Sequence, residues 1–138
     1  MERKLNKIWI NGTFDVVHRG HIELIKFASE LGSLRIGIDS DNRVKKMKGE
    51  NRPKTNHFDR KILLESLKYV DSVVIFDTDD ELISNIIDWK TDIFVIGSDY
   101  KNKRIIGSEF VNEILFFERI EQYSSTKIIG DEKNISDR

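Results

Sequence analysis

The sequence from Asn11 to His21 is NGTFDVVHRGH. An apolar run, 8–10, precedes this stretch, and a helical pattern of apolar residues follows it over 22–28. We therefore expect a strand, then a turn of small residues, then a helix that begins near two histidines. Backbone N–H groups are available at a turn and at a helix N-terminus, and the helix dipole favours negative charge there. The stretch therefore predicts a binding site for phosphate.

The two histidines of this stretch strengthen the prediction. His18 and His21 are three residues apart with Gly20 between them, so both imidazoles can face the same bound anion. A single histidine beside an apolar run is usually structural. Two histidines in this spacing, directly after a glycine turn at the end of a strand, have the context that a phosphate-binding motif requires. We therefore assign them a functional role.

Length, charge and composition limit the kind of protein. The chain has 138 residues, enough for one domain with a core and too few for two ordinary domains. Its net charge is −1, whereas nonspecific nucleic-acid binders are usually basic, so we expect no nucleic-acid partner. There are no cysteines, which excludes disulfides and thiolate metal sites. We find no apolar stretch of about 18 residues and no secretory signal, and expect a cytoplasmic protein without a membrane partner.

Short apolar runs alternate with amphipathic segments along the chain. This alternation is typical of a parallel sheet that helices cover on both faces. Right-handed crossovers then give a single-domain, doubly wound, Rossmann-like α/β fold with a parallel sheet of about five strands. We expect this domain to span 1–130, followed by a polar tail over 131–138. The expected strands are 7–11, 34–39, 72–76, 93–96 and 114–117, the expected helices are 21–31, 58–69, 80–89, 105–111 and 124–129, and 43–56 is expected to be a loop that can open with a short helix.

In an open sheet of this kind, ligands bind outside the carboxyl ends of the strands. Three polar segments follow expected strands at that edge, namely 12–21, 41–48 and 97–100. They are therefore expected to meet at one site.

Residues 12–15, GTFD, followed by HRGH at 18–21, resemble the signature of the cytidylyltransferase-like nucleotidylyltransferases. These enzymes join a nucleoside triphosphate to a phosphorylated alcohol or sugar and release pyrophosphate. The resemblance covers 8–129 and implies that His18 and His21 are catalytic, because they contact the phosphates and stabilise charge on the α-phosphorus. Asp15 could instead be only a turn-stabilising carboxylate. The residues of this block that the resemblance assigns to nucleotide binding are Gly12, Thr13, Phe14, Asp15 and Gly20.

A second block, KMKG at 46–49, resembles a basic segment that brings positive charge to the phosphates. The resemblance makes Lys48 catalytic and Lys46 a nucleotide contact, although most charge runs are only a solvated surface. Arg60 matches a family arginine that reaches the phosphate of the acceptor. Its alternative is a surface arginine on a helix.

Two further blocks lie toward the C-terminus. In 97–100, GSDY, the resemblance assigns Asp99 to the nucleotide, although an aspartate at a turn is often only a local cap. In 119–126, RIEQYSST, it makes Arg119 a catalytic phosphate ligand. Gln122 stands where family members usually carry glycine. The same segment supplies the last predicted nucleotide contacts, Ser124, Ser125 and Thr126.

Other features are interpreted as structural. Trp9 and Phe14 are expected in the core, Trp89 is expected to pack at the end of a helix, and His57 receives no assigned role. The segment 67–71, LKYVD, resembles one near the dimer contact of related enzymes, with lysine where the glycerol-phosphate branch usually has arginine. The resemblance therefore implies a homodimer.

Two branches of the family compete as the specific prediction. GTFD and Arg119 resemble the branch that makes CDP-glycerol from CTP and glycerol 3-phosphate. Segments 48–53 and 99–108 resemble the branch that adenylylates a heptose 1-phosphate with ATP. We favour CTP and a small phosphorylated polyol, for surface-polymer precursors, and keep ATP with heptose 1-phosphate as the alternative. A regulator that binds nucleotide without turnover is an alternative of another class.

The family chemistry implies Mg²⁺ as the cofactor. Such an ion would be held largely by the triphosphate, as is common for Mg²⁺. No residue of this chain is assigned as a metal ligand.

Overall fold

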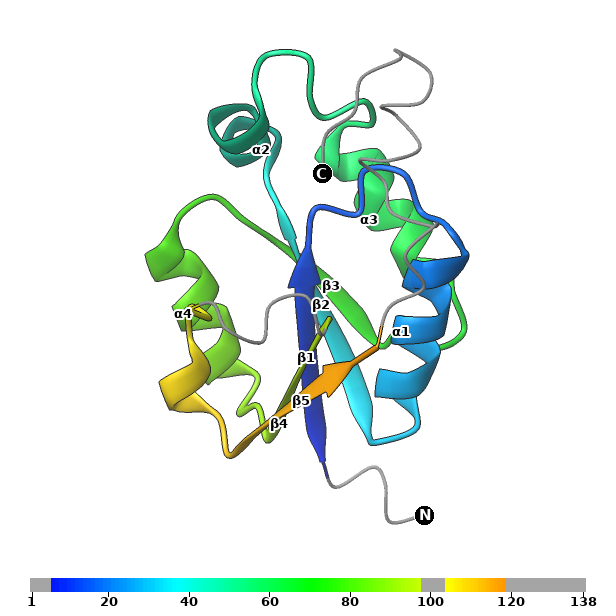
Figure 1. The fold of residues 1–138 in the computed structure, drawn as a ribbon, viewed down its shortest axis with the longest axis vertical. Coiled ribbons are helices and arrows are strands. Elements are labelled where there is room, and N and C mark those ends of the chain that lie inside the picture. Colours follow the sequence, from blue (N-terminus) through cyan, green and yellow to red (C-terminus); the bar gives the residue numbers. More distant parts are fainter. Residues whose placement is uncertain (1–5, 98–103, 119–138) are drawn as a thin grey trace.

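The computed structural model describes residues 6–97 and 104–118, and within these residues it contains one parallel sheet of five strands in the order β3-β2-β1-β4-β5 (Figure 1). The order reverses direction at β1, which pairs with both β2 and β4. This arrangement confirms the expected Rossmann-like fold. The strands are β1 (Lys7–Gly12), β2 (Ser33–Asp39), β3 (Ser72–Phe76), β4 (Ile93–Gly97) and β5 (Glu113–Phe117).

Helices cover both faces of the sheet. Helices α1 and α3 pack on one face and α4 packs on the other, while α2 lies beyond the carboxyl end of β2 (Figure 1). This end of the sheet is the one where the polar segments of the sequence were expected to meet. The helices are α1 (Arg19–Ser29), α2 (Asp41–Lys48), α3 (His57–Glu65) and α4 (Asp79–Asp88), with a short 3₁₀ turn, η3, at Ser108–Phe110.

The two faces of the sheet form two separate apolar cores. Successive side chains of a strand point to opposite faces. Ile8 and Ile10 therefore pack with α1 and α3, while Trp9 between them packs with α4. Phe14 belongs to the first core, so the sequence placed both Trp9 and Phe14 correctly. Burial of the strands on both faces explains their nearly continuous apolar sequence.

A glycine in β2 makes room for the largest core side chain. A Cβ added at Gly37 would lie 2.4 Å from Cζ2 of Trp9 and 3.2 Å from Cε2 of Phe76. The indole of Trp9 is 0 % exposed and fills the space that a side chain at Gly37 would need. Its Nε1 donates a hydrogen bond to Oδ1 of Asn11 at 2.9 Å. The close approach of β2 to the indole therefore depends on the missing side chain at Gly37.

The helix expected at 58–69 ends earlier than its pattern suggests. Ser66 caps α3, and the chain then turns so that the Asp71 carboxylate accepts the backbone N–H of Leu34 at 2.7 Å. Leu67 and Tyr69 still pack against the first core, although they lie outside the helix. Their apolar character therefore reflects burial and not helical spacing.

The prediction of a helix at 105–111 is wrong. The structure has only the three-residue turn Ser108–Phe110, preceded by Gly107 in a left-handed conformation with φ of 91°. Ile105 and Ile106 pack against the second core without forming a helix. The helix expected at 124–129 and the domain limit at 130 lie outside the described residues. Within 6–97 and 104–118, every helix is too short or too polar to span a lipid bilayer.

Candidate active site at the carboxyl edge of the sheet

The two predicted histidines lie at the start of α1. His18 is the N-cap, and the rings of His18 and His21 are stacked with centroids 3.8 Å apart and planes at 20°. The backbone N–H of His18 donates to Nδ1 of His21 at 3.3 Å, and the Phe14 ring lies 4.9 Å from that of His21. Because Nδ1 of His21 accepts, the proton of its neutral imidazole lies on Nε2, a hydrogen-bond donor.

The GTFD turn before these histidines is tightly packed. A Cβ added at Gly12 would lie 3.2 Å from Cε2 of Phe14, so the glycine allows the ring to fold back over the strand end. Phe14 has φ of 51°, a region that non-glycine residues rarely adopt. It is also buried at 5 % exposure, so packing holds it in this conformation. The turn is therefore held rigidly next to the histidines.

Asp15 ties the GTFD turn to the loop before α3. Its two carboxylate oxygens accept Nε of Arg52 at 2.9 Å, the backbone N–H of Lys54 at 2.8 and 2.9 Å, and that of Thr55 at 2.9 Å. Burial alone would raise the pKa of Asp15, but these hydrogen bonds and the Arg52 charge outweigh it, so the pKa lies below its usual value. These contacts fit the interpretation of Asp15 as a turn-stabilising carboxylate, and its contact with the nucleotide stays a prediction.

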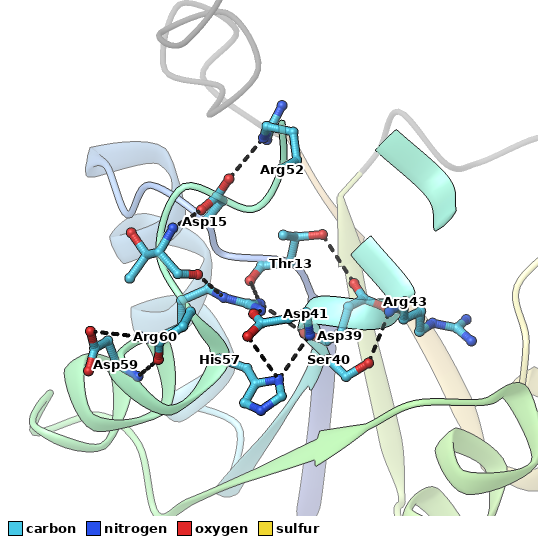
Figure 2. Close-up of polar contacts among 12 residues, drawn as sticks. Thr13, Asp15, Asp39, Ser40, Asp41, Arg43, Arg52, His57, Asp59 and Arg60 are labelled. Carbon is cyan, nitrogen blue, oxygen red and sulfur yellow. Dashed lines mark hydrogen bonds and ion pairs between the residues drawn. The ribbon is translucent and has the colours of Figure 1, made fainter. Parts of the chain in front are cut away.

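Arg60 has a different place from the one predicted. Its side chain is 1 % exposed, and its guanidinium donates to four groups inside the protein, so it is not presented to an acceptor phosphate (Figure 2). It joins the turn after β1, the end of β2, the start of α2 and the loop before α3. The contacts are Nη1 to the carbonyls of Thr13 at 2.8 Å and Asp39 at 2.9 Å, Nε to the carbonyl of Thr55 at 2.8 Å, and Nη2 to Oδ1 of Asp41 at 2.8 Å.

A polar cluster at the end of β2 was missed by the sequence analysis. The hydroxyl of Thr13, predicted to face the nucleotide, donates to Oδ2 of Asp39 at 3.1 Å (Figure 2). Oδ1 of Asp39 pairs with Nε of Arg43 at 2.8 Å, and Nη2 of Arg43 reaches Asp79 at 2.9 Å. Burial would lower the pKa of Arg43, but these two carboxylates raise it. The signal in the sequence was the position of Asp39 at the carboxyl end of an apolar strand.

His57 contributes to the same cluster. Its Nδ1 accepts the backbone N–H of Asp41 at 2.9 Å, at the first turn of α2 (Figure 2). The N-cap of α2 is Ser40, whose hydroxyl accepts the N–H of Arg43 at 3.0 Å. Two side chains thus satisfy N–H groups that a helix start leaves without intrahelical partners.

The predicted lysines lie on α2, and both Lys46 and Lys48 are exposed. Lys46 lines an open groove of about 590 Å³ between α2 and the start of α4. This groove is next to the site and does not include the histidines. Its other lining residues are Arg43, Met47, Asp77, Thr78, Asp79 and Asp80.

Gly20, predicted to bind the nucleotide, is buried in the first turn of α1. The structure thus brings the residues of 12–21 to one edge of the sheet and sets α2 beside them. Among the described residues, no group of three His, Asp or Glu side chains could hold a metal ion. The predictions for Asp99, Arg119, Ser124, Ser125 and Thr126 lie outside the described residues.

The parallel α/β sheet and the stacked histidine pair at the helix that follows β1 fit the family that the sequence motifs resemble. The Cytidylyltransferase-like family model matches residues 9–131. The chain therefore belongs to the cytidylyltransferase-like family, as the resemblance of its motifs predicted.

Two curated relatives are more than 40 % identical to this chain over the aligned residues. "Bifunctional protein HldE" of Campylobacter fetus subsp. fetus (strain 82-40) is 43 % identical over 125 residues, covering 89 % of this chain and 27 % of the relative. "Bifunctional protein HldE" of Helicobacter pylori (strain P12) is 46 % identical over 123 residues, covering 88 % and 26 %. The chain thus spans about a quarter of the length of these relatives.

A solved structure has the same fold. It is described as the lipopolysaccharide core biosynthesis protein from Thermoplasma volcanium GSS1, with a TM-score of 0.67 and 24 % identity. The match covers 82 % of this chain and 97 % of that one. At this level of identity the likeness supports the fold alone.

Proposed function

We propose that this chain transfers AMP from ATP to a heptose 1-phosphate, giving an ADP-sugar for surface-polymer synthesis and releasing pyrophosphate. The single observation that carries nucleotidyl transfer is the stacked pair His18 and His21 at the N-terminus of α1, directly after the GTFD turn. The pair lies at a helix N-terminus, where backbone amides and the helix dipole favour binding of phosphate.

The reaction needs no protein nucleophile. A phosphate oxygen of the acceptor attacks the α-phosphorus in line, the new O–P bond forms, and the bond to the β-phosphate oxygen breaks to release pyrophosphate. The protein holds the two reactants together and stabilises the negative charge that builds on the α-phosphate oxygens. His21 can do this with Nε2–H, because its Nδ1 is occupied by the backbone of His18.

Mg²⁺ is proposed as the cofactor. When bound to the triphosphate, it would neutralise charge on the phosphates and on the leaving pyrophosphate. The described residues offer no cluster of three ligands for it, so the phosphates and water would supply most of its coordination.

The adenylyl branch is preferred over the cytidylyl branch for two reasons. The relatives that match nearly the whole chain are HldE proteins, which favour the heptose alternative. Within the sequence, 48–53 (KGENRP) and 99–108 also resemble that branch. Two sequence features, GTFD and Arg119, favoured CTP, and two segments favour the heptose branch, so the preference depends on the relatives.

A pyrophosphate-release matrix tests the proposal. ATP, CTP, GTP and UTP with Mg²⁺ would each be combined with a heptose 1-phosphate, glycerol 3-phosphate and other phospho-polyols. Release with ATP and the heptose 1-phosphate alone is the expected result. Release with CTP and glycerol 3-phosphate would overturn the choice of branch, and nucleotide binding without release from any pair would contradict catalysis.

The homodimer implied by the segment 67–71 remains a prediction. Measurement of the mass in solution by light scattering tests it, and a monomeric mass at the concentration of the assay would contradict it.

A further inference from the structure

Arg52 is one of the few buried cations of the described residues, and it lies on the loop between α2 and α3. Its side chain is 10 % exposed, and its Nε pairs with Oδ2 of Asp15, which is 0 % exposed, at 2.9 Å. The pair joins this loop to the GTFD turn, three residues before His18. The guanidinium of Arg52 is therefore positioned beside the turn that leads into the candidate phosphate site (Figure 2).

The ion pair with Asp15 leaves one nitrogen of the Arg52 guanidinium without a hydrogen bond in the described part of the chain. Nη2 of Arg52 is buried and has no hydrogen-bond partner among the described residues. Asp15 cannot supply one, because its oxygens already accept the backbone N–H groups of Lys54 and Thr55 as well as Nε of Arg52. Buried donors are almost always paired, so an unpaired one indicates a missing ligand or water.

Comparison with Arg60 shows that the unsatisfied donor is specific to Arg52. Arg60 is buried even more deeply, and each of its three nitrogens donates to a carbonyl or carboxylate of the protein. Arg60 therefore has the hydrogen bonding of a structural residue. Arg52 instead has one edge fixed by Asp15 and another edge that still requires an acceptor.

We propose that Arg52 is a phosphate-binding residue of this site, oriented by Asp15, and that its Nη groups contact a phosphate of the nucleotide or of the acceptor. A guanidinium binds phosphate through two parallel N–H···O bonds. Because Asp15 fixes the plane of the Arg52 guanidinium, such binding would be selective. The inference names a ligand contact within the function proposed above and rests on it.

The two possible sources of the phosphate can be separated by kinetics. The variants are Arg52→Gln and Arg52→Lys, and the matched control is Lys54→Gln, which removes the same charge from an exposed side chain of the same loop. We expect Arg52→Gln to raise KM by about tenfold to a hundredfold for one phosphate-bearing substrate. Arg52→Lys should recover only part of this loss, because an ammonium cannot form the bidentate contact. A higher KM for ATP would assign the phosphate to the nucleotide. A higher KM for the sugar phosphate would assign it to the acceptor.

A measurement on the unaltered protein avoids the risk that Arg52 variants fail to fold. The side-chain Nε–Hε signal of Arg52, identified by its loss in Arg52→Lys, would be followed in ¹⁵N NMR spectra during titration with inorganic phosphate, pyrophosphate and ATP. The Nε signal of Arg35, which bonds to Ser72 near the opposite edge of the sheet, is the internal control. We expect the Arg52 signal to shift with saturation and the Arg35 signal to stay.

The outcomes separate this inference from the proposed function. An Arg52 signal that moves no more than that of Arg35, together with KM values of Arg52→Gln within about twofold of Lys54→Gln, would overturn the inference while catalysis stands. Saturable shifts without turnover by any substrate pair would support the phosphate site and contradict the proposed reaction. Both measurements use the full chain.

Discussion

The imidazole of His21 lies under that of His18, with ring centroids 3.8 Å apart, and it accepts the backbone N–H of the same residue. In the helix convention this is an N-cap residue bonded to the third helical residue, the place that Glu or Gln occupies in a capping box. The histidine that caps the backbone therefore also lies at the helix start, where phosphate binding is proposed. One side chain thus serves both the helix end and the candidate reaction.

We expect His18→Ala or His21→Ala to lower kcat by about a hundredfold or more, since each removes a group that stabilises charge in the transition state. The measurement is pyrophosphate release, with circular dichroism to show that the fold persists. His57→Ala is the control, because the third histidine accepts the N–H of Asp41 and lies in another cluster. If either variant of the pair turns over as fast as His57→Ala, the catalytic assignment is wrong.

Arg60→Gln is expected to cost roughly 3–5 kcal/mol of unfolding free energy, because it breaks the pair of a buried guanidinium with the partly exposed Asp41 and leaves three backbone carbonyls without their donor. Urea unfolding measures this cost. The matched control is Lys61→Gln, a partly exposed neighbour on α3 that pairs with Glu65 and should change stability by less than about 1 kcal/mol. A stable Arg60→Gln variant with a raised KM for the acceptor would restore the acceptor-binding interpretation.

Asp15 should make stability depend on acidic pH. Its pKa is lowered from the ordinary value of 3.8, so the unfolded chain takes up this proton at a higher pH than the folded protein. The contribution of Asp15 is therefore fully present above pH 3.8 and is lost as the pH falls through the folded pKa. Urea unfolding of the wild type and of Asp15→Asn at several pH values tests this. The difference between their free energies of unfolding should become smaller below about pH 4. A difference that stays constant with pH would show that the charge of Asp15 does not cause the stabilisation.

Gly37→Ala should destabilise the fold by about 1–3 kcal/mol, because the new Cβ would overlap the indole of Trp9. Thermal unfolding measures the effect. Trp9→Phe in the same chain removes Cζ2 and Cη2, the two nearest atoms, and should recover part of the loss. Equal destabilisation by Gly37→Ala in both backgrounds would place the strain elsewhere.

Much of the fold could be predicted because its signals are local. The run SVVIF predicted the bounds of β3, Ser72–Phe76, without error, since the strands of a covered parallel sheet are mostly apolar. The histidine spacing likewise placed two imidazoles at the start of α1, where His18 is the N-cap and His21 the third helical residue. These features depend on periodicity, which the sequence contains in full.

The roles of the charged residues depended on the tertiary structure. Arg60 was expected at the acceptor, yet its partners include the carbonyl of Thr13, 47 residues away, and that of Asp39, 21 residues away. Asp15 and Arg52 are 37 residues apart and form a pair that no local pattern indicates. The sequence by itself determined the strands, the first helix and the histidine pair, because neighbouring residues set them. Only the tertiary structure decided which cations are buried and which can bind phosphate, because a long charged side chain is satisfied by whatever acceptors the folded chain brings within hydrogen-bond distance.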